Sequence, residues 1–226
     1  MAWVESDGSN GYILTIAGKE KIIANPDSSY LFYEFKKVTE IKNIGLFNTN
    51  NVENMKSMFG YCNSIVSLDL SNFNTSNVKY MNGMFRNWYM CENLDLSNFD
   101  ISSVTGVGSM FEDSSFISLN LDGWDTSNVI DMSFMFFRCN RLISLGNKGL
   151  DICGSVDIQS MFSYTTKLKA TLNIRGSFRN VHQTFYKGIS DQSSQITLNY
   201  AEGKENLVDN FIVSYPDANL VKGVQI

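Results

Sequence analysis

The residues that could carry acid–base or nucleophilic chemistry are few in this chain, and they form no recognisable catalytic arrangement. His182 is the single histidine among 226 residues, and no serine or cysteine motif lies at nucleophile spacing around it. A hydrolase triad needs a nucleophile, a histidine base and an orienting carboxylate in one place. We therefore predict that no residue is catalytic and that the protein is not an enzyme.

The four cysteines predict neither a metal site nor a disulfide. No CxxC or Cys/His spacing typical of zinc ligands occurs. Cys62 and Cys139 hold the same position in a sequence repeat, three turns apart, which is about 14 Å at the spacing of stacked strands. A disulfide cannot bridge that distance. We predict buried, reduced thiols that pack as small apolar groups, with no metal and no cofactor.

Two groups of residues could bind a ligand. The first is polar and alternates with leucines in three similar segments: Ser67, Asp69, Asn93, Asp95, Ser118 and Asn120. It predicts a binding surface for glycan or protein, or a solvated face without a ligand. Asp69 and Asp95 would lie side by side and repel each other, a repulsion that a weakly bound cation or, as we favour, solvent screening would relieve.

The second group consists of aromatic residues that lie off the repeating pattern: Trp88, Tyr89, Tyr80, Phe134 and Phe137. Trp88-Tyr89 stands where other repeats have Tyr61-Cys62 or Arg138-Cys139. Such aromatics predict either an exposed patch at an interface or lateral packing over adjacent turns.

A repeat of 25–26 residues is the dominant feature of the sequence and must position these side chains. Its clearest marker is a Met-Phe pair, which recurs at Met58-Phe59, Met84-Phe85, Met110-Phe111, Met135-Phe136 and Met161-Phe162. Other positions keep the same phase. Most of the 10 Met and 16 Phe therefore belong to one motif, and we expect them to form a stacked core.

Each repeat can be divided into two elements. Segments such as Ser67-Leu68-Asp69-Leu70-Ser71 alternate polar and apolar residues, which predicts a short half-buried strand. A Thr/Ser/Asn segment then precedes Val78, Met81, Met84 and Phe85, whose spacing predicts a capped short helix with one apolar stripe. The fold class expected is α/β, a right-handed leucine-rich-repeat-type solenoid with short parallel strands on one face and short helices on the other.

The repeat resembles that of the BspA-like leucine-rich-repeat proteins of bacteria. The resemblance rests on the pattern that begins at Met58, passes through Asp69-Leu70-Ser71-Asn72-Phe73 and ends at Met81, and that recurs from Met84 to Met110. It covers roughly residues 31–183 and departs from the pattern at Asp151-Ile152-Cys153-Gly154-Ser155-Val156. Members of that family are typically surface-attached or secreted proteins linked to adhesion. Related arrays are familiar among phage structural proteins.

Both ends of the repeat array predict caps. Residues 1–30 contain two alternating segments around Asp7-Gly8-Ser9-Asn10-Gly11, which predicts a hairpin in an N-terminal β cap. Residues 31–189 form the solenoid of about six repeats. Residues 190–226 predict a C-terminal cap with a strand at 195–200, a helix that ends before Pro216, and a last strand at 219–224. No linker interrupts the chain, so we expect one continuous domain.

Charge and hydropathy exclude some partners. A formal net charge of −5 disfavours nucleic acid, because phosphate binding needs clustered Lys and Arg. No segment has the ~18–20 apolar residues of a membrane helix, so we predict no membrane insertion, and the first residues lack the features of a secretion signal.

Two functions remain. The first is a non-catalytic binding or adhesion module of a bacterial surface or secreted protein, located at the cell surface or outside the cell, with a protein or glycan ligand. The alternative is an accessory or receptor-binding protein of a phage or tailocin tail or baseplate, located in the particle.

Overall fold

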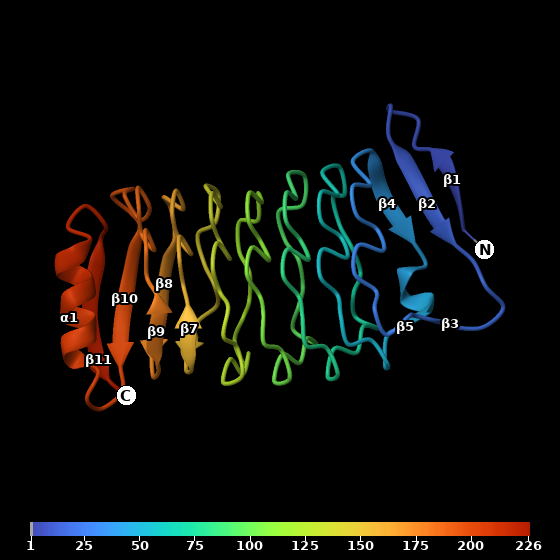
Figure 1. The fold of residues 1–226 in the computed structure, drawn as a ribbon. Coiled ribbons are helices and arrows are strands. Elements are labelled where there is room, and N and C mark those ends of the chain that lie inside the picture. The colour runs from blue at the N-terminus through green and yellow to red at the C-terminus, as the bar shows by residue number, and fades with distance from the viewer. Residues whose placement is uncertain (1) are drawn as a thin grey trace.

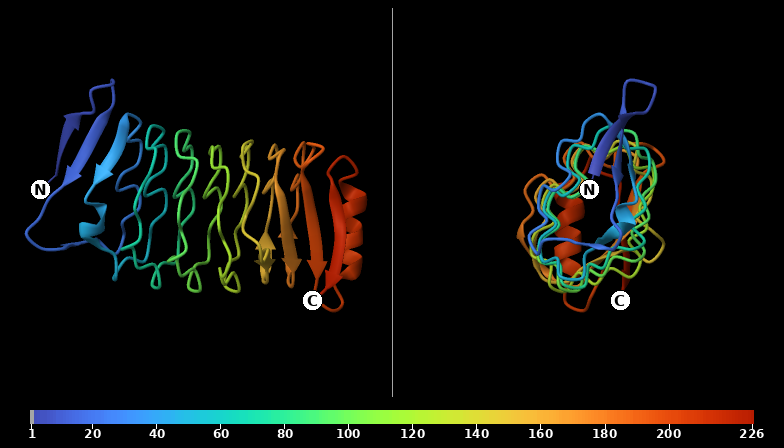
Figure 2. Two further views of the ribbon diagram at one scale, coloured as in Figure 1. Left: turned by 180° about the vertical axis from the view of Figure 1, so that it is seen from behind. Right: turned by 90° about the vertical axis from the view of Figure 1, so that its right-hand side faces the viewer.

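The chain winds into an elongated β-solenoid whose turns stack from the N-terminal to the C-terminal end (Figure 1). This is a computed structural model, and it describes residues 2–226. Seen along its long axis, the successive turns superimpose as a flattened ring (Figure 2). The predicted stack of repeats is therefore confirmed.

Regular strands gather at the two ends of the solenoid. The elements, in chain order, are β1 Ala2–Ser6, β2 Tyr12–Ile16, β3 Ile22–Ile23, β4 Val38–Lys42, the 3-10 turn η1 Ile44–Leu46, β5 Phe47–Asn48, β6 Leu150–Ile152, β7 Ser155–Asp157, β8 Lys169–Ile174, β9 Ser177–Asn180, β10 Gln195–Tyr200, α1 Glu205–Ser214 and β11 Leu220–Gln225. Four sheets result, with strand orders β1-β2-β4, β3-β5, β7-β9 and β11-β10-β8-β6. All pairings of these strands are parallel except β1 with β2.

The middle repeats touch through isolated parallel bridges instead of continuous strands. Asn93 bridges to Ser118, and Ser118 bridges to Ser144. The strands predicted at residues 67–71 and 93–97 do not form, because the carboxylate of Asp69 accepts the N–H of Ser71 (3.0 Å) and turns the chain there. Asp95 does the same with the N–H of Ser97 (2.9 Å).

The short helices predicted in each repeat are wrong, since α1 is the one α-helix in residues 2–226. In their place the backbone forms a ladder of turns. The N–H of Met55 donates to the carbonyl of Tyr80 (2.9 Å) and that of Phe59 to Met84 (3.1 Å), whereas the intervening Met58 closes a turn onto Met55 (3.1 Å). An α-helix would need all these N–H groups for carbonyls four residues back.

Left-handed residues also exclude a helix from these segments. One such residue occurs in every turn at the same position, including Ser57, Gly83, Ser109, Phe134 and Ser160.

We call the surface made by these turns the turn face; it comprises residues 28–36, 54–62, 80–88, 105–114, 131–139, 157–165 and 180–188. The opposite surface, which carries the leucine-alternating segments, is the leucine face; it comprises residues 65–71, 91–97, 117–122, 143–148, 169–174 and 195–200.

The Thr/Ser/Asn segments form corner turns that fasten neighbouring repeats, and they are not helix caps. The hydroxyl of Thr75 donates to the carbonyl of Asp100 (2.9 Å) and accepts the N–H of the same residue (2.8 Å). Thr126 donates likewise to the carbonyl of Asp151 (2.7 Å). These threonines are buried, so each corner satisfies backbone groups that would otherwise lie unpaired in the interior.

The core is a continuous stack of phenylalanine rings with methionines beside it. The rings lie nearly parallel, with neighbouring centroids 5.2–6.0 Å apart, in the order Phe32, Phe59, Phe85, Phe111, Phe136, Phe162 and Phe185. The Met of each Met-Phe pair is fully buried. The predicted Met and Phe core is confirmed.

A second buried column lies three residues after the five inner stacked phenylalanines, Phe59 to Phe162. Its side chains donate to the carbonyl of the phenylalanine one repeat earlier: Cys62 to Phe32, Trp88 to Phe59, Ser114 to Phe85, Cys139 to Phe111 and Thr165 to Phe136. We call these five residues the donor column. Its cysteines are buried and unpaired, as predicted, but they serve as donors as well as packing groups.

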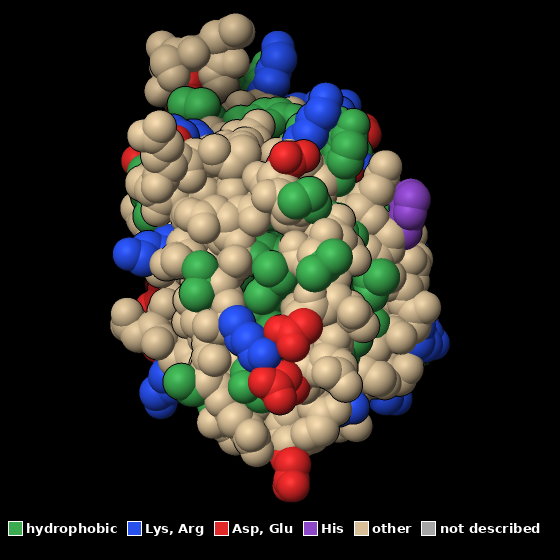
Figure 3. All heavy atoms as spheres, turned by 90° about the vertical axis from the view of Figure 1, so that its left-hand side faces the viewer, with side chains coloured by type: hydrophobic (Ala, Val, Ile, Leu, Met, Phe, Trp, Pro, Cys, Tyr) green, Lys and Arg blue, Asp and Glu red, His purple; other side chains and the backbone are tan. Residues whose placement is uncertain are grey.

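The two ends of the stack are closed differently. Strand β1 runs antiparallel to β2, so the parallel stacking stops there. At the other end, Val208 and Phe211 of α1 are buried, and the Phe211 ring meets the Phe178 ring edge-on at 5.0 Å. Viewed from that end, hydrophobic side chains appear only as small areas among polar atoms (Figure 3).

Candidate binding faces

The polar residues predicted to bind a ligand are all exposed on the leucine face. Ser67, Asp69, Asn93 and Asp95 are exposed, as are Ser118 and Asn120. The structure brings Asn93 and Ser118 together through their parallel bridge. This face therefore offers a row of small polar side chains to solvent.

The acidic residues of this row already have a structural role. Hydrogen bonding from the hydroxyl and N–H of Ser71 lowers the pKa of Asp69, and the N–H and hydroxyl of Ser97 lower the pKa of Asp95. Asn120 accepts the N–H of Asp122 (3.1 Å) in the same manner. Mutual repulsion of Asp69 and Asp95 would raise their pKa values instead, so turn formation accounts for these carboxylates.

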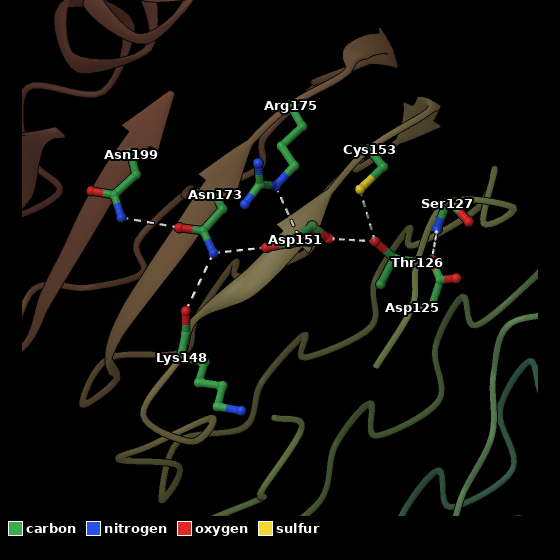
Figure 4. Close-up of polar contacts among 9 residues, drawn as sticks. All are labelled: Asp125, Thr126, Ser127, Lys148, Asp151, Cys153, Asn173, Arg175 and Asn199. Carbon is green, nitrogen blue, oxygen red and sulfur yellow. Dashed lines mark hydrogen bonds and ion pairs between the residues drawn. The ribbon is translucent and has the colours of Figure 1, made fainter. Parts of the chain in front are cut away.

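Toward the C-terminal end, the leucine face satisfies its polar groups internally (Figure 4). Asn199 donates to Asn173 (3.0 Å), and Asn173 donates to the Asp151 carboxylate (2.7 Å). Arg175 donates to the other oxygen of Asp151 (2.9 Å). Asn173 is buried among these neighbours.

The Trp88 side chain contributes to no exposed surface. Its side chain is 0% exposed, and its indole N–H donates to the carbonyl of Phe59 (2.7 Å). Trp88 is equivalent to Cys62, not to Tyr61, so the alignment predicted from the sequence was shifted by one residue. Tyr89 is 45% exposed, and its hydroxyl donates to the side-chain oxygen of Asn87.

Aromatic and basic side chains line the turn face instead. Edge-to-face pairs join Tyr33 to Tyr61 (5.4 Å) and Tyr164 to Tyr186 (5.7 Å) across adjacent turns. The Arg86 guanidinium lies 5.6 Å from the centre of the Tyr61 ring.

A second cluster of this type includes Phe134 and Phe137, whose rings meet edge-on at 5.6 Å. Arg138 lies over Phe137 (5.0 Å) and Tyr164 (5.7 Å). The half-buried Phe134 and Phe137 pack laterally over neighbouring turns, which is one of the two arrangements that the sequence left open, whereas Tyr80 is exposed.

The sequence carries a signal for this face that the prediction of helices obscures. An aromatic residue follows the stacked phenylalanine by one or two positions in most repeats, at Tyr33, Tyr61, Phe137, Tyr164 and Tyr186. The helices predicted for these segments give those positions no common surface.

A groove of about 560 Å³ lies beside His182, between α1 and the last turn. Phe178, Val181, Leu207 and Phe211 supply its apolar wall, and no Asp or Glu is among its described lining residues. Within residues 2–226, no three His, Cys, Asp or Glu side chains gather as metal ligands would. The ten-residue α1 is too short and too polar to cross a membrane, and no other described helix could do so.

Comparison with known families gives one match. The family described as "Mycoplasma protein of unknown function, DUF285" matches residues 27–147 and 95–194, which together cover most of the chain. No curated protein and no solved structure matches.

Proposed function

The chain belongs to the DUF285 family, and from this premise we propose that it is a non-catalytic binding module that contacts a protein or glycan ligand through its turn face. We further propose that it is a BspA-like adhesion protein that acts at the surface of a bacterium or outside it.

The main support for this proposal is the exposure of aromatic side chains on the turn face. Tyr30 is 49% exposed and Tyr186 is 41% exposed, although the core of the solenoid is complete without them. Aromatic and arginine side chains are enriched at protein interfaces, where they supply large contact areas. On the leucine face, Asp69 and Asp95 already cap turns, and the exposed large apolar side chains are the aliphatic Val66 and Ile143.

The test compares the two faces. The labelled protein would be applied to intact bacterial and host cells and to panels of glycans and extracellular proteins. A turn-face variant, Tyr30→Ser with Tyr186→Ser, should bind at least tenfold more weakly than the wild type. A leucine-face variant, Asp69→Asn with Asp95→Asn, should bind as the wild type does.

The reverse ranking of the two variants would assign binding to the leucine face. Absence of binding to every cell and panel member would contradict an adhesion role. Thermal unfolding of both variants would show whether a loss of binding reflects a loss of fold.

A further inference from the structure

A hollow of about 280 Å³ opens on the turn face in the N-terminal half of the solenoid. Its walls include Tyr30, Tyr33 and Tyr61, and its polar groups include Asn82, Arg86 and Asp131. Together with Gly108 and Ser109, these residues come from five successive turns.

Gly108 lines the hollow, and Gly106 lies two residues before it in the same turn. Gly106 and Gly108 stand where the preceding repeat has Tyr80 and Asn82. A Cβ atom on Gly108 would lie 2.6 Å from a carboxylate oxygen of Asp131, and one on Gly106 would lie 2.6 Å from the amide oxygen of Asn82. The absence of side chains here leaves space that other repeats fill.

Two polar side chains meet across this gap. The amide of Asn82 donates to the carboxylate of Asp131 (3.0 Å), although the two residues are 49 positions apart and belong to turns separated by a third. The second oxygen of Asp131 accepts the N–H of Ser133 (2.9 Å) and its hydroxyl (2.6 Å). A carboxylate and an amide are thus held side by side at the base of the hollow.

The tyrosine wall offers rings and hydroxyl groups. The hydroxyls of Tyr30, Tyr33 and Tyr61 make no hydrogen bond to any residue that the structure describes. Burial raises the pKa of Tyr33, so its hydroxyl stays protonated and can donate.

Arg86 adds an unused donor beside the Tyr61 ring. Its Nη2 atom donates to Glu112 (2.6 Å), whereas its buried Nε atom has no hydrogen-bond partner among the described residues.

These groups favour a ligand that is recognised by side chains and not by backbone hydrogen bonds. The backbone of the turn face cannot pair with a peptide strand, because its N–H groups already donate hydrogen bonds to neighbouring turns. The N–H of Ser57, for example, donates to the carbonyl of Asn82 (2.9 Å). The charges in and beside the hollow balance, since Lys56 and Arg86 are matched in number by Asp131 and by Glu112, the ion-pair partner of Arg86. A neutral ligand rich in hydroxyl groups fits this chemistry.

We propose that the hollow binds one or two sugar rings of a neutral oligosaccharide, an inference that rests on the proposed binding function. The apolar C–H face of a sugar ring would lie against the tyrosine rings. Its hydroxyls would donate to Asp131 and exchange hydrogen bonds with Asn82. The volume of the hollow lies near the lower end of the range of about 300–1,000 Å³ for ligand sites, so a longer glycan would extend beyond it along the turn face.

Calorimetric titration with maltose, cellobiose, lactose and chitobiose tests this assignment. Tyr61→Ala and Asp131→Asn should each weaken binding of the preferred disaccharide at least tenfold. The matched controls are Tyr164→Ala and Asp157→Asn. Tyr164 has the same repeat position and nearly the same φ as Tyr61 (60° against 61°), and Asp157 is equivalent to Asp131; neither control residue lines the hollow.

Two outcomes would overturn the proposal. One is that no disaccharide binds at millimolar concentration, and the other is that the control variants weaken binding as much as the hollow variants do. Tyr61→Phe, which keeps the ring, should bind the disaccharide more tightly than Tyr61→Ala. This second variant tests the role of the ring even if the alanine variant folds poorly. If cells or proteins still bind the turn face while the disaccharides do not, the result supports the proposed binding function and contradicts only the sugar site.

Discussion

At the scale of single residues, the donor column explains why chemically different side chains occupy one repeat position. Cys62, Trp88 and Ser114 share little except a hydrogen that can be donated, and each donates to the carbonyl of the phenylalanine one repeat earlier. A buried carbonyl without a partner costs free energy. The position therefore selects for a donor and tolerates a wide range of volumes.

Ser114 provides the sharpest test of this role. Its hydroxyl donates to the carbonyl of Phe85 (2.8 Å) and accepts the N–H of Trp88 (3.2 Å). Ser114→Ala should lower the free energy of unfolding by about 1–3 kcal/mol, because both backbone groups lose their partner. Ser115→Ala is the control, since Ser115 bonds to Trp88 through its backbone N–H (2.8 Å), and should change stability by less than about 0.5 kcal/mol. Equal losses in urea unfolding would contradict the role.

The buried thiols predict a loss of stability at alkaline pH. Burial raises the pKa of Cys62 and of Cys139 to about 12, from 9.0 for a free thiol. The unfolded chain ionises these thiols above about pH 9 while the folded chain keeps them protonated, so their contribution is complete below pH 9 and is lost as the pH rises toward 12. The free energy of unfolding should fall by about 1.4 kcal/mol per thiol for each pH unit above 9.

Urea unfolding at about pH 7.5 and about pH 10 measures this effect. Cys139→Ser removes one titrating group and keeps a donor, so the variant should lose less stability between the two pH values than the wild type. The idea fails if the wild type and the variant show the same pH dependence.

At the scale of elements, the turn ladder replaces the helices that the sequence predicted. Apolar residues three positions apart over eight residues fit a series of three-residue turns as well as they fit a helix of 3.6 residues per turn. Hydrogen bonding to neighbouring repeats decides between the two, and each ladder turn then needs residues in the left-handed region. No pattern within one repeat contains that information.

Ser57 tests the left-handed requirement. Its φ angle is 51°, a conformation that a β-branched residue adopts at a cost of about 1–2 kcal/mol. Ser57→Val should destabilise the protein by that amount, and Ser57→Gly should leave it as stable or more so. Lys56→Val, the control one residue earlier outside the left-handed set, should have a smaller effect in thermal unfolding. If Ser57→Val proves as stable as Ser57→Gly, the ladder is not restrained at this position.

At the scale of the whole molecule, the solenoid depends on its closed ends. A stack of ring and strand layers ends in unpaired edges and exposed apolar side chains unless another element covers them. Helix α1 closes the last layer through Phe211, whose ring contacts both Phe178 and Phe185.

Phe211→Ala should therefore open the C-terminal end. We expect a loss of about 3–5 kcal/mol in the free energy of unfolding and concentration-dependent self-association in light scattering. Val213→Ala is the matched control on the same helix, because Val213 is 78% exposed, and it should leave both quantities unchanged. Unaltered stability of the Phe211→Ala variant would mean that α1 does not seal the core.

The sequence by itself determined the repeat, its period, the buried Met and Phe residues, the strand β10, the helix α1 and the final strand β11. These features follow from local periodicity and from apolar burial, which leave a record in the order of residues. The tertiary structure alone decided that turns replace helices, that Trp88 lies inside, and that Asn82 meets Asp131 above Gly106 and Gly108. Each of these depends on how one turn aligns with the next, and contacts between turns have no signature within a single repeat.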